Sequence, residues 1–176
     1  VPMLIAGDVT GINPRQIIRS YPMDGVSDAE PNYLAHVEID SPELPWMFSR
    51  PSPDGKLRPW ISLAVIDVTE VARPEDDPLK KARLGYKLTT TADQLPDPAE
   101  ADLWAHVQLL DSDTAPGDPT RSLARIVSPR KLEPSRRYLA CLVPTLLSAR
   151  EAGLDNGDAK RLSSDYAWDA TGSASV

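Results

Sequence analysis

The chain has 176 residues, of which 41% are hydrophobic and 26% are charged, and its formal net charge is -7. This composition is typical of a globular domain that buries its own core. The acidic balance argues against a nucleic-acid partner, because neutralising phosphates requires clustered lysine and arginine side chains. No apolar run approaches the roughly 18 residues that cross a bilayer, so we expect no membrane partner.

The single cysteine excludes an internal disulfide framework. The first residues lack the basic region of a signal peptide, and together these two features predict a cytoplasmic protein. The chain begins with valine and ends in a run of small residues. We interpret it as a fragment of a longer protein.

Proline is enriched, at 18 of 176 residues, and its spread along the chain predicts short elements separated by turns. From the N-terminus, the pattern predicts a strand over residues 3–9 and one helical turn over 13–19, which Asn13 caps. Alternating apolar residues then predict a half-buried strand over 33–39.

The most apolar run of the chain follows two Pro-Trp steps, Pro45-Trp46 and Pro59-Trp60. The sequence Ile-Ser-Leu-Ala-Val-Ile at 61–66 predicts a central buried strand, which we extend over 60–71. We expect Trp60 to anchor its packing, because aromatic rings contribute large apolar areas to a core.

The second half of the chain predicts further short elements. A strand is expected over 84–90 and a helix from Asp97 to His106, since Asp97-Pro98 combines a capping residue with proline at the first helical position. The remaining elements are a strand over 107–110, a helix over 120–127, a strand over 137–143 and a helix from Pro144 to Gly153.

Together these elements predict an α+β fold, a mostly antiparallel sheet with short flanking helices. The main strands of that sheet are expected from 33–39, 60–71 and 137–143. We assign residues 1–154 to a single α+β domain. Residues 155–176 are predicted to form an extended or mobile tail, because they are polar and small.

Few residues are suited to catalysis. A pair of Cys141 with either histidine would require a closeness that spacing cannot show. Glu38 and Asp40 lie two apart on one strand, as in a carboxylate pair for glycoside hydrolysis, but on a half-exposed strand solvent-facing charge is the favoured interpretation. No nucleophile-elbow, phosphate-loop or dinucleotide fingerprint is present. We therefore predict no catalytic and no cofactor-binding residues.

Metal binding is not expected either. The histidine and cysteine spacing provides no zinc ligand set. The acidic stretch at 111–118 starts like a calcium loop, but Ala115 stands where a third oxygen ligand is needed and no glutamate closes the loop. The sequence thus predicts no metal ligands and no cofactor.

Two aromatic residues in the tail are the candidate interaction site. Tyr166 and Trp168 lie two apart in an otherwise polar segment, so in an extended chain their side chains face the same side. We expect this tail to be ordered only through contact, either with its own sheet or with a neighbouring copy.

Several blocks occur together in one order: Gly-Asp-Val-Thr-Gly-Ile-Asn-Pro-Arg at 7–15, Leu-Pro-Trp-Met-Phe at 44–48, Leu-Arg-Pro-Trp at 57–60, Trp-Ala-His-Val-Gln at 104–108 and Arg-Tyr-Leu-Ala-Cys-Leu-Val-Pro at 137–144. In these blocks the chain resembles the N-terminal part of a large uncharacterised bacterial protein family. That family is common in actinobacteria and associated with phage-tail-like gene neighbourhoods. The resemblance covers most of the chain and implies a longer protein, but it brings no activity or site residues.

The sequence therefore predicts a non-enzymatic structural or assembly module of a larger bacterial protein. Its expected partner is the rest of its own longer chain or another protein, with a homo-oligomer as a further alternative. The competing hypothesis is the N-terminal domain of a hydrolase or glycan-binding protein. Four side chains distinguish the two hypotheses: His36, Glu38, Asp40 and His106. Their convergence in one concave pocket would favour the enzyme, and their dispersal would favour the module.

Overall fold

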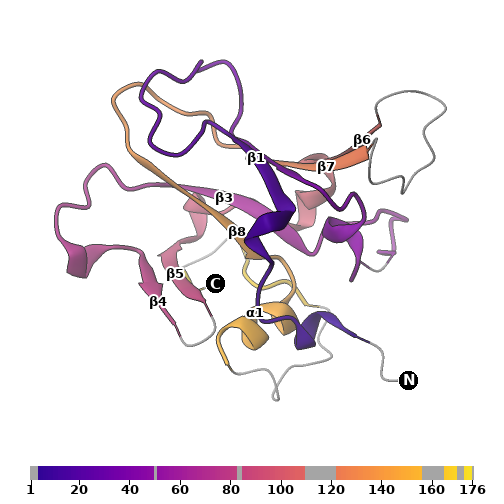
Figure 1. Ribbon diagram of the computed structural model, residues 1–176. Helices are drawn as coiled ribbons and strands as arrows, with labels where there is room; N and C mark the ends of the chain where they lie inside the picture. The colour runs from indigo at the N-terminus through magenta and orange to yellow at the C-terminus, as the bar shows by residue number, and fades with distance from the viewer. Residues whose placement is uncertain are drawn as a thin grey trace.

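A computed structural model describes residues 4–49, 51–82, 85–109, 122–155, 165–169 and 173–175. The fold is α+β, with antiparallel sheets as its main component and short helices beside them (Figure 1). The predicted fold class is confirmed.

The largest sheet has four antiparallel strands in the order β1-β2-β7-β6. Its strands are β1 (Ile17–Tyr21), β2 (His36–Ile39), β6 (Ala105–Leu109) and β7 (Ser122–Val127). Successive side chains along a strand point to opposite faces. One face of the two central strands is therefore apolar and buried in the first core cluster, through Val37, Ile39, Ala124 and Ile126.

The apolar run at 61–66 forms the centre of the second sheet. Strand β3 (Ile61–Asp67) pairs along its whole length with β8 (Tyr138–Pro144). Trp60 is buried beside it, packs edge-on against Phe48 and donates a hydrogen bond from Nε1 to the Leu44 carbonyl at 2.7 Å. The buried strand over 61–66 and its tryptophan anchor are confirmed, but the strand ends at Asp67 and does not continue to residue 71.

The third sheet, in the order β4-β5-β9, contains the last described residues of the chain. Its strands are β4 (Leu79–Lys81), β5 (Tyr86–Thr91) and β9 (Ser173–Ser175). Because β9 pairs with β5, the C-terminus lies beside β5 in Figure 1. A second core cluster includes Ala64, Ile66, Leu88, Leu95, Val143, Ala167 and Trp168.

Helical residues in the described part of the chain are mostly in short 3-10 turns. Helix α1 (Leu147–Gly153) packs against η1 (Ala6–Asp8). The other turns are η2 (Pro14–Gln16), η3 (Leu44–Trp46), η4 (Pro74–Asp76), η5 (Ala92–Gln94) and η6 (Pro98–Leu103). The predicted caps Asn13 and Asp97 both accept a backbone hydrogen bond. Among the described residues, no helix has the length and apolar character needed to span a membrane.

Several predicted elements are wrong in type or extent. The described part of the strand predicted over 3–9 contains the turn η1, in which the Asp8 carboxylate accepts a hydrogen bond from the Ile5 amide at 3.1 Å. The turn predicted over 13–19 ends early, because residues from Ile17 onward join β1. The helix predicted from Asp97 ends at Leu103, and His106 therefore lies in β6.

A further correction concerns residues 120–127, where a helix is expected and the described residues form β7. Burial alternates along this segment because successive side chains point to opposite faces and one face packs in the first core cluster. Strands β2 and β6 pair with it on both sides. The main strands also do not form one sheet, since β2 lies in the four-stranded sheet while β3 and β8 pair with each other. Sheet membership depends on partners distant in sequence, which local periodicity does not specify.

Candidate functional site

One face of the four-stranded sheet gathers a row of charged and titratable side chains. Arg19 of β1 lies opposite Glu38 of β2, and Glu38 lies opposite Arg125 of β7. On its other side, Arg125 lies opposite His106 of β6. Opposite residues in an antiparallel pair place their side chains on the same face. The sheet thus aligns four side chains from four separate segments, which we name the charged row.

Glu38 is the centre of the charged row. It is only 5% exposed, and a buried carboxylate requires partners that compensate its charge. Nη2 of Arg125 lies 2.5 Å from Oε1, and Nε of Arg19 lies 3.5 Å from Oε2. Because both carboxylate oxygens are engaged by guanidinium groups, Glu38 is poorly suited to act as a general base or nucleophile.

The two arginines of the charged row differ in exposure. The side chain of Arg125 is 28% exposed, whereas that of Arg19 is 72% exposed. Arg125 is therefore the inner counter-ion of Glu38. The longer contact of Arg19 is screened by water and holds its side chain only weakly.

Aromatic side chains extend the same face. The ring of Tyr21 stacks on His36 with centroids 5.5 Å apart, and Tyr33 meets Tyr21 edge-on at 5.7 Å. Nδ1 of His36 lies 3.0 Å from the Leu34 carbonyl oxygen. A carbonyl oxygen only accepts, so this nitrogen carries the proton and donates it. Tyr33 is 63% exposed and gives this face an accessible aromatic ring.

His106 ends the charged row on β6. Partial burial lowers the pKa of His106, and the charges of Arg125 and His36 lower it further. His36 of β2 and His106 of β6 lie on the same face, on the two strands that flank β7. The structure thus brings together three of the candidate residues from the sequence, His36, Glu38 and His106.

Asp40 and Cys141 are placed differently. Asp40 follows the end of β2, is exposed, and donates its backbone N–H to the Gln16 carbonyl at 2.8 Å. Cys141 lies opposite Ala64 in the two-stranded sheet. Burial raises the pKa of its thiol to about 11, so the thiol is protonated at neutral pH and is a weak nucleophile.

Strand β1, which carries Arg19 of the charged row, forms an edge of the four-stranded sheet. In the part of the chain that the structure describes, its partner strand is β2 alone. Its first three residues, including the apolar Ile17 and Ile18, are exposed. The register shifts between Ile17 and Arg19, and pairing continues regularly from Arg19 to Tyr21.

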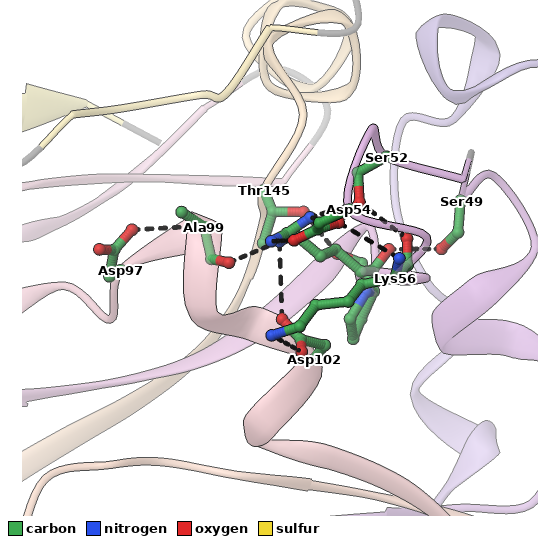
Figure 2. A network of polar contacts seen from close by, with 10 residues as sticks. Ser49, Ser52, Asp54, Lys56, Asp97, Ala99, Asp102 and Thr145 are labelled. Atoms are coloured by element: carbon green, nitrogen blue, oxygen red, sulfur yellow. Dashed lines mark hydrogen bonds and ion pairs between the residues drawn. The ribbon is translucent and has the colours of Figure 1, made fainter.

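A second polar network surrounds Arg58 and is shown in Figure 2. Nη2 of Arg58 lies 2.7 Å from Oδ2 of Asp54, and Nη1 donates to the Ser52 hydroxyl at 2.6 Å. On the other side, Nε of Arg58 donates to the Ala99 carbonyl and lies 3.5 Å from Oδ1 of Asp102. The network thereby connects the turn before β3 to η6.

Charges within the Arg58 network compensate one another. Lys56 contacts Oδ2 of Asp102 at 2.9 Å. Hydrogen bonds from Arg58 and Ser52 hold the pKa of the Asp54 carboxyl well below its usual range. The hydrogen bond with Asp54 raises the pKa of Arg58 in turn. These mutual contacts favour a structural role, in which the network holds the turn before β3 against η6, over a role in ligand binding.

The described tail residues pack onto the domain. Trp168 is 8% exposed, and its Nε1 donates to the Pro96 carbonyl at 2.9 Å. The backbone N–H of Ala167 donates to the Thr145 carbonyl at 2.8 Å. Trp168 therefore belongs to the second core cluster of its own chain.

Tyr166 differs from Trp168 although the two lie only two residues apart. Its backbone forms an antiparallel bridge with Leu146, but the residue is 41% exposed. The electrostatic influence of its phenol contributes to the raised pKa of Arg58. Of the two predicted interaction residues, Tyr166 is the one whose side chain remains accessible.

The described residues contain no group of three or more histidine, cysteine, aspartate and glutamate side chains placed to hold a metal ion. The acidic stretch at 111–118 lies outside the described residues.

The arginines of the charged row are the functional candidates that sequence reasoning missed. Arg19 lies in a segment predicted as a helical turn, and Arg125 in one predicted as a helix. The available signal is the period-two pattern around Arg125, which stands between the buried Ala124 and Ile126.

Comparison with known proteins identifies no family for the chain. No protein-family model, curated protein sequence or solved structure matches it.

Proposed function

We propose that the chain is a non-enzymatic structural or assembly module of a larger bacterial protein. Its contact surface is the charged row, the adjoining aromatic residues and the β1 edge. The observation that carries the proposal is the ion pairing of Glu38, whose two carboxylate oxygens face Arg125 and Arg19. A carboxylate neutralised in this way is suited to fixing a surface and not to moving protons.

The residue types on this surface support a contact with protein. Tyrosine and arginine are enriched among the residues that dominate binding energy in protein interfaces. Tyr33 precedes β2 and contacts Tyr21, which lies two residues after Arg19 on β1, and both Tyr33 and Arg19 present exposed side chains. The partner is the rest of a longer chain or a separate protein, and a second copy of the chain is the alternative partner.

Two further features are consistent with this proposal. The resemblance that we infer from the order of the sequence blocks implies a longer parent chain. The single, half-buried thiol of Cys141, with its raised pKa, fits a cytoplasmic protein, in which disulfides are rare.

One observation favours the alternative, a hydrolase or glycan-binding domain. Tyr21, Tyr33 and His36 form an aromatic group on the exposed face, and exposed aromatic rings combine apolar surface with a polar group, as a sugar ligand requires. Glycan-array binding that is lost in Tyr33→Ala would support this alternative.

Site-specific photo-crosslinking in cells that produce the longer protein tests the assembly proposal. The photoreactive residue p-benzoylphenylalanine replaces Tyr33 in one variant and Tyr86 in the control. The two tyrosines are matched, with 63% and 66% exposure, but Tyr86 lies on β5 of another sheet. We expect a protein crosslink from position 33 and none from position 86.

Mass spectrometry then identifies the crosslinked segment within the parent chain or in a partner. The proposal fails if position 33 gives no crosslink, or if both positions crosslink to the same extent.

A further inference from the structure

We infer that β1 accepts an extended acidic protein segment as an additional strand of the four-stranded sheet. This inference rests on the proposed function, because it names the kind of partner that the module takes. In such strand addition, the backbone of the partner pairs with the sheet edge, and pockets for alternate side chains give specificity.

The position of β1 supports strand addition. It is the outer strand of its sheet, and its described pairing is with β2 on one side only. Ile18, at the register shift, and Arg19 are adjacent and both exposed, so an added strand would meet an apolar side chain and a cation at this edge. The same fold already covers another edge this way, since β9 adds three residues beside β5.

The charge order of the row specifies an acidic partner. Across the sheet, Arg19 is positive, Glu38 is negative and Arg125 is positive. Opposite charges facing each other across neighbouring strands stabilise a sheet, and like charges destabilise it. The next position outward from Arg19 therefore favours a carboxylate. Arg19 can supply donors to it, because its side chain is 72% exposed and Arg125 makes the shorter contact with Glu38.

The local sequence argues against a second β1 as the partner. Between Asp8 and Asp24 the chain contains Arg15 and Arg19 and no acidic residue, although the net charge of the whole chain is -7. Two β1 strands paired with each other would bring arginines together without a carboxylate between them. The complementary partner is thus a different segment, one that carries aspartate or glutamate.

Edge strands often carry charges and register shifts, which discourage pairing with unselected strands. In β1 the register shift lies at the Ile17 end, so the segment from Arg19 to Tyr21 keeps regular geometry. The charge of Arg19 discourages basic or apolar strands and favours an acidic one. Both features are therefore compatible with a selective edge.

Peptide binding to the purified chain, followed by amide chemical shifts, tests the inference. The probe is an acetylated and amidated peptide of about nine alternating glutamate and valine residues, a length typical of a strand. One control peptide carries lysine in place of each glutamate. Two further controls keep the glutamates but carry N-methyl groups on one or the other set of alternate residues, which removes the backbone donors of one edge.

Matched protein variants locate the contact. Arg19→Ala should weaken binding of the acidic peptide about fivefold, the size expected for an exposed charge pair. Arg19→Lys should restore part of the affinity. Arg73→Ala removes another exposed arginine, in a loop outside the sheet, and should leave the affinity unchanged.

The expected result is saturable shifts in amides of β1 with the acidic peptide, weaker binding of the lysine peptide, and loss of binding in one N-methylated peptide. Equal binding of all peptides, shifts outside the sheet, no binding, or self-association that Arg19→Ala abolishes would each overturn the inference. If the crosslink from position 33 forms while the acidic peptide fails, the assembly function stands and strand addition is wrong.

Discussion

Arg125 on β7 and Glu38 on β2 face each other across the sheet, with Nη2 and Oε1 2.5 Å apart. The pair stands at the boundary of the first core, because the neighbouring residues on the opposite face, Val37 and Ala124, are buried. The same interaction therefore stabilises the sheet and fixes the charges that its exposed face presents.

Replacing Glu38 by glutamine should destabilise the fold by about 2 kcal/mol, because Arg125 would lose its counter-ion in a half-buried position. Chemical denaturation measures this change in the free energy of unfolding. The control is Glu133→Gln, whose carboxylate lies 3.6 Å from Arg136 at the surface. The control should change stability by at most about 0.5 kcal/mol. Equal losses in the two variants would contradict the structural role given to Glu38.

Trp60→Ala should cost roughly 3–5 kcal/mol, because it removes a buried indole beside β3 and leaves a cavity. Trp60→Phe keeps an aromatic ring but removes the Nε1 hydrogen bond to Leu44, so a smaller loss of about 1 kcal/mol is expected. Thermal and chemical unfolding of both variants provide the measurement. A Trp60→Ala protein that unfolds with the parent would show that the ring does not anchor the core.

Trp168→Ala should release the tail, because the indole fills the second core cluster and bonds to Pro96. Tyr166→Ala should have little effect on tail protection, since the ring is partly exposed. Limited proteolysis with mass mapping compares cleavage after residue 154 in both variants. Circular dichroism confirms that the remaining fold is intact. Equal resistance of Trp168→Ala and the parent would disprove tail docking through this residue.

Acid should destabilise the fold in part through His106, whose pKa lies below the ordinary value of 6.5 because of burial, Arg125 and His36. Above that value both states are neutral, and the shift contributes nothing to stability. As pH falls through it, the unfolded chain binds the proton first, so stability decreases until the folded pKa is passed. His106→Gln should lose less stability than the parent between about pH 8 and pH 5. Titration of the imidazole by NMR provides the direct check, and a pKa above the ordinary value would be the contrary result.

Cys141 should react slowly with alkylating reagents in the folded protein. Its pKa of about 11 leaves on the order of one thiolate in a thousand at pH 8. Unfolding in denaturant should restore the ordinary reactivity of cysteine. Mass spectrometry of iodoacetamide-treated samples measures both rates, and equal rates with and without denaturant would contradict the burial of this thiol.

Local chemistry in the sequence was sufficient for several elements. The run at 61–66 predicts β3 because six successive residues with few polar atoms can be buried only between other elements, and all six are buried. Asn13 and Asp97 predict the starts of η2 and η6, because a capping oxygen and a following proline act within one turn. These features depend on neighbours in sequence, and they hold in the structure.

Tertiary structure alone decided the pairing of strands and with it the candidate site. Residues 122–127 form a strand because β2 and β6 supply hydrogen-bond partners on both sides. The period-two pattern around Arg125 indicates a strand, but it does not specify these partners. Arg19, Glu38 and Arg125 are distant in sequence, and they become neighbours in the charged row only through the pairing register of the sheet. Likewise, the composition of the tail predicts contact, but the core determines that Trp168 is buried while Tyr166 stays accessible. Burial and ion pairing depend on the whole fold, because each requires partners that distant segments supply.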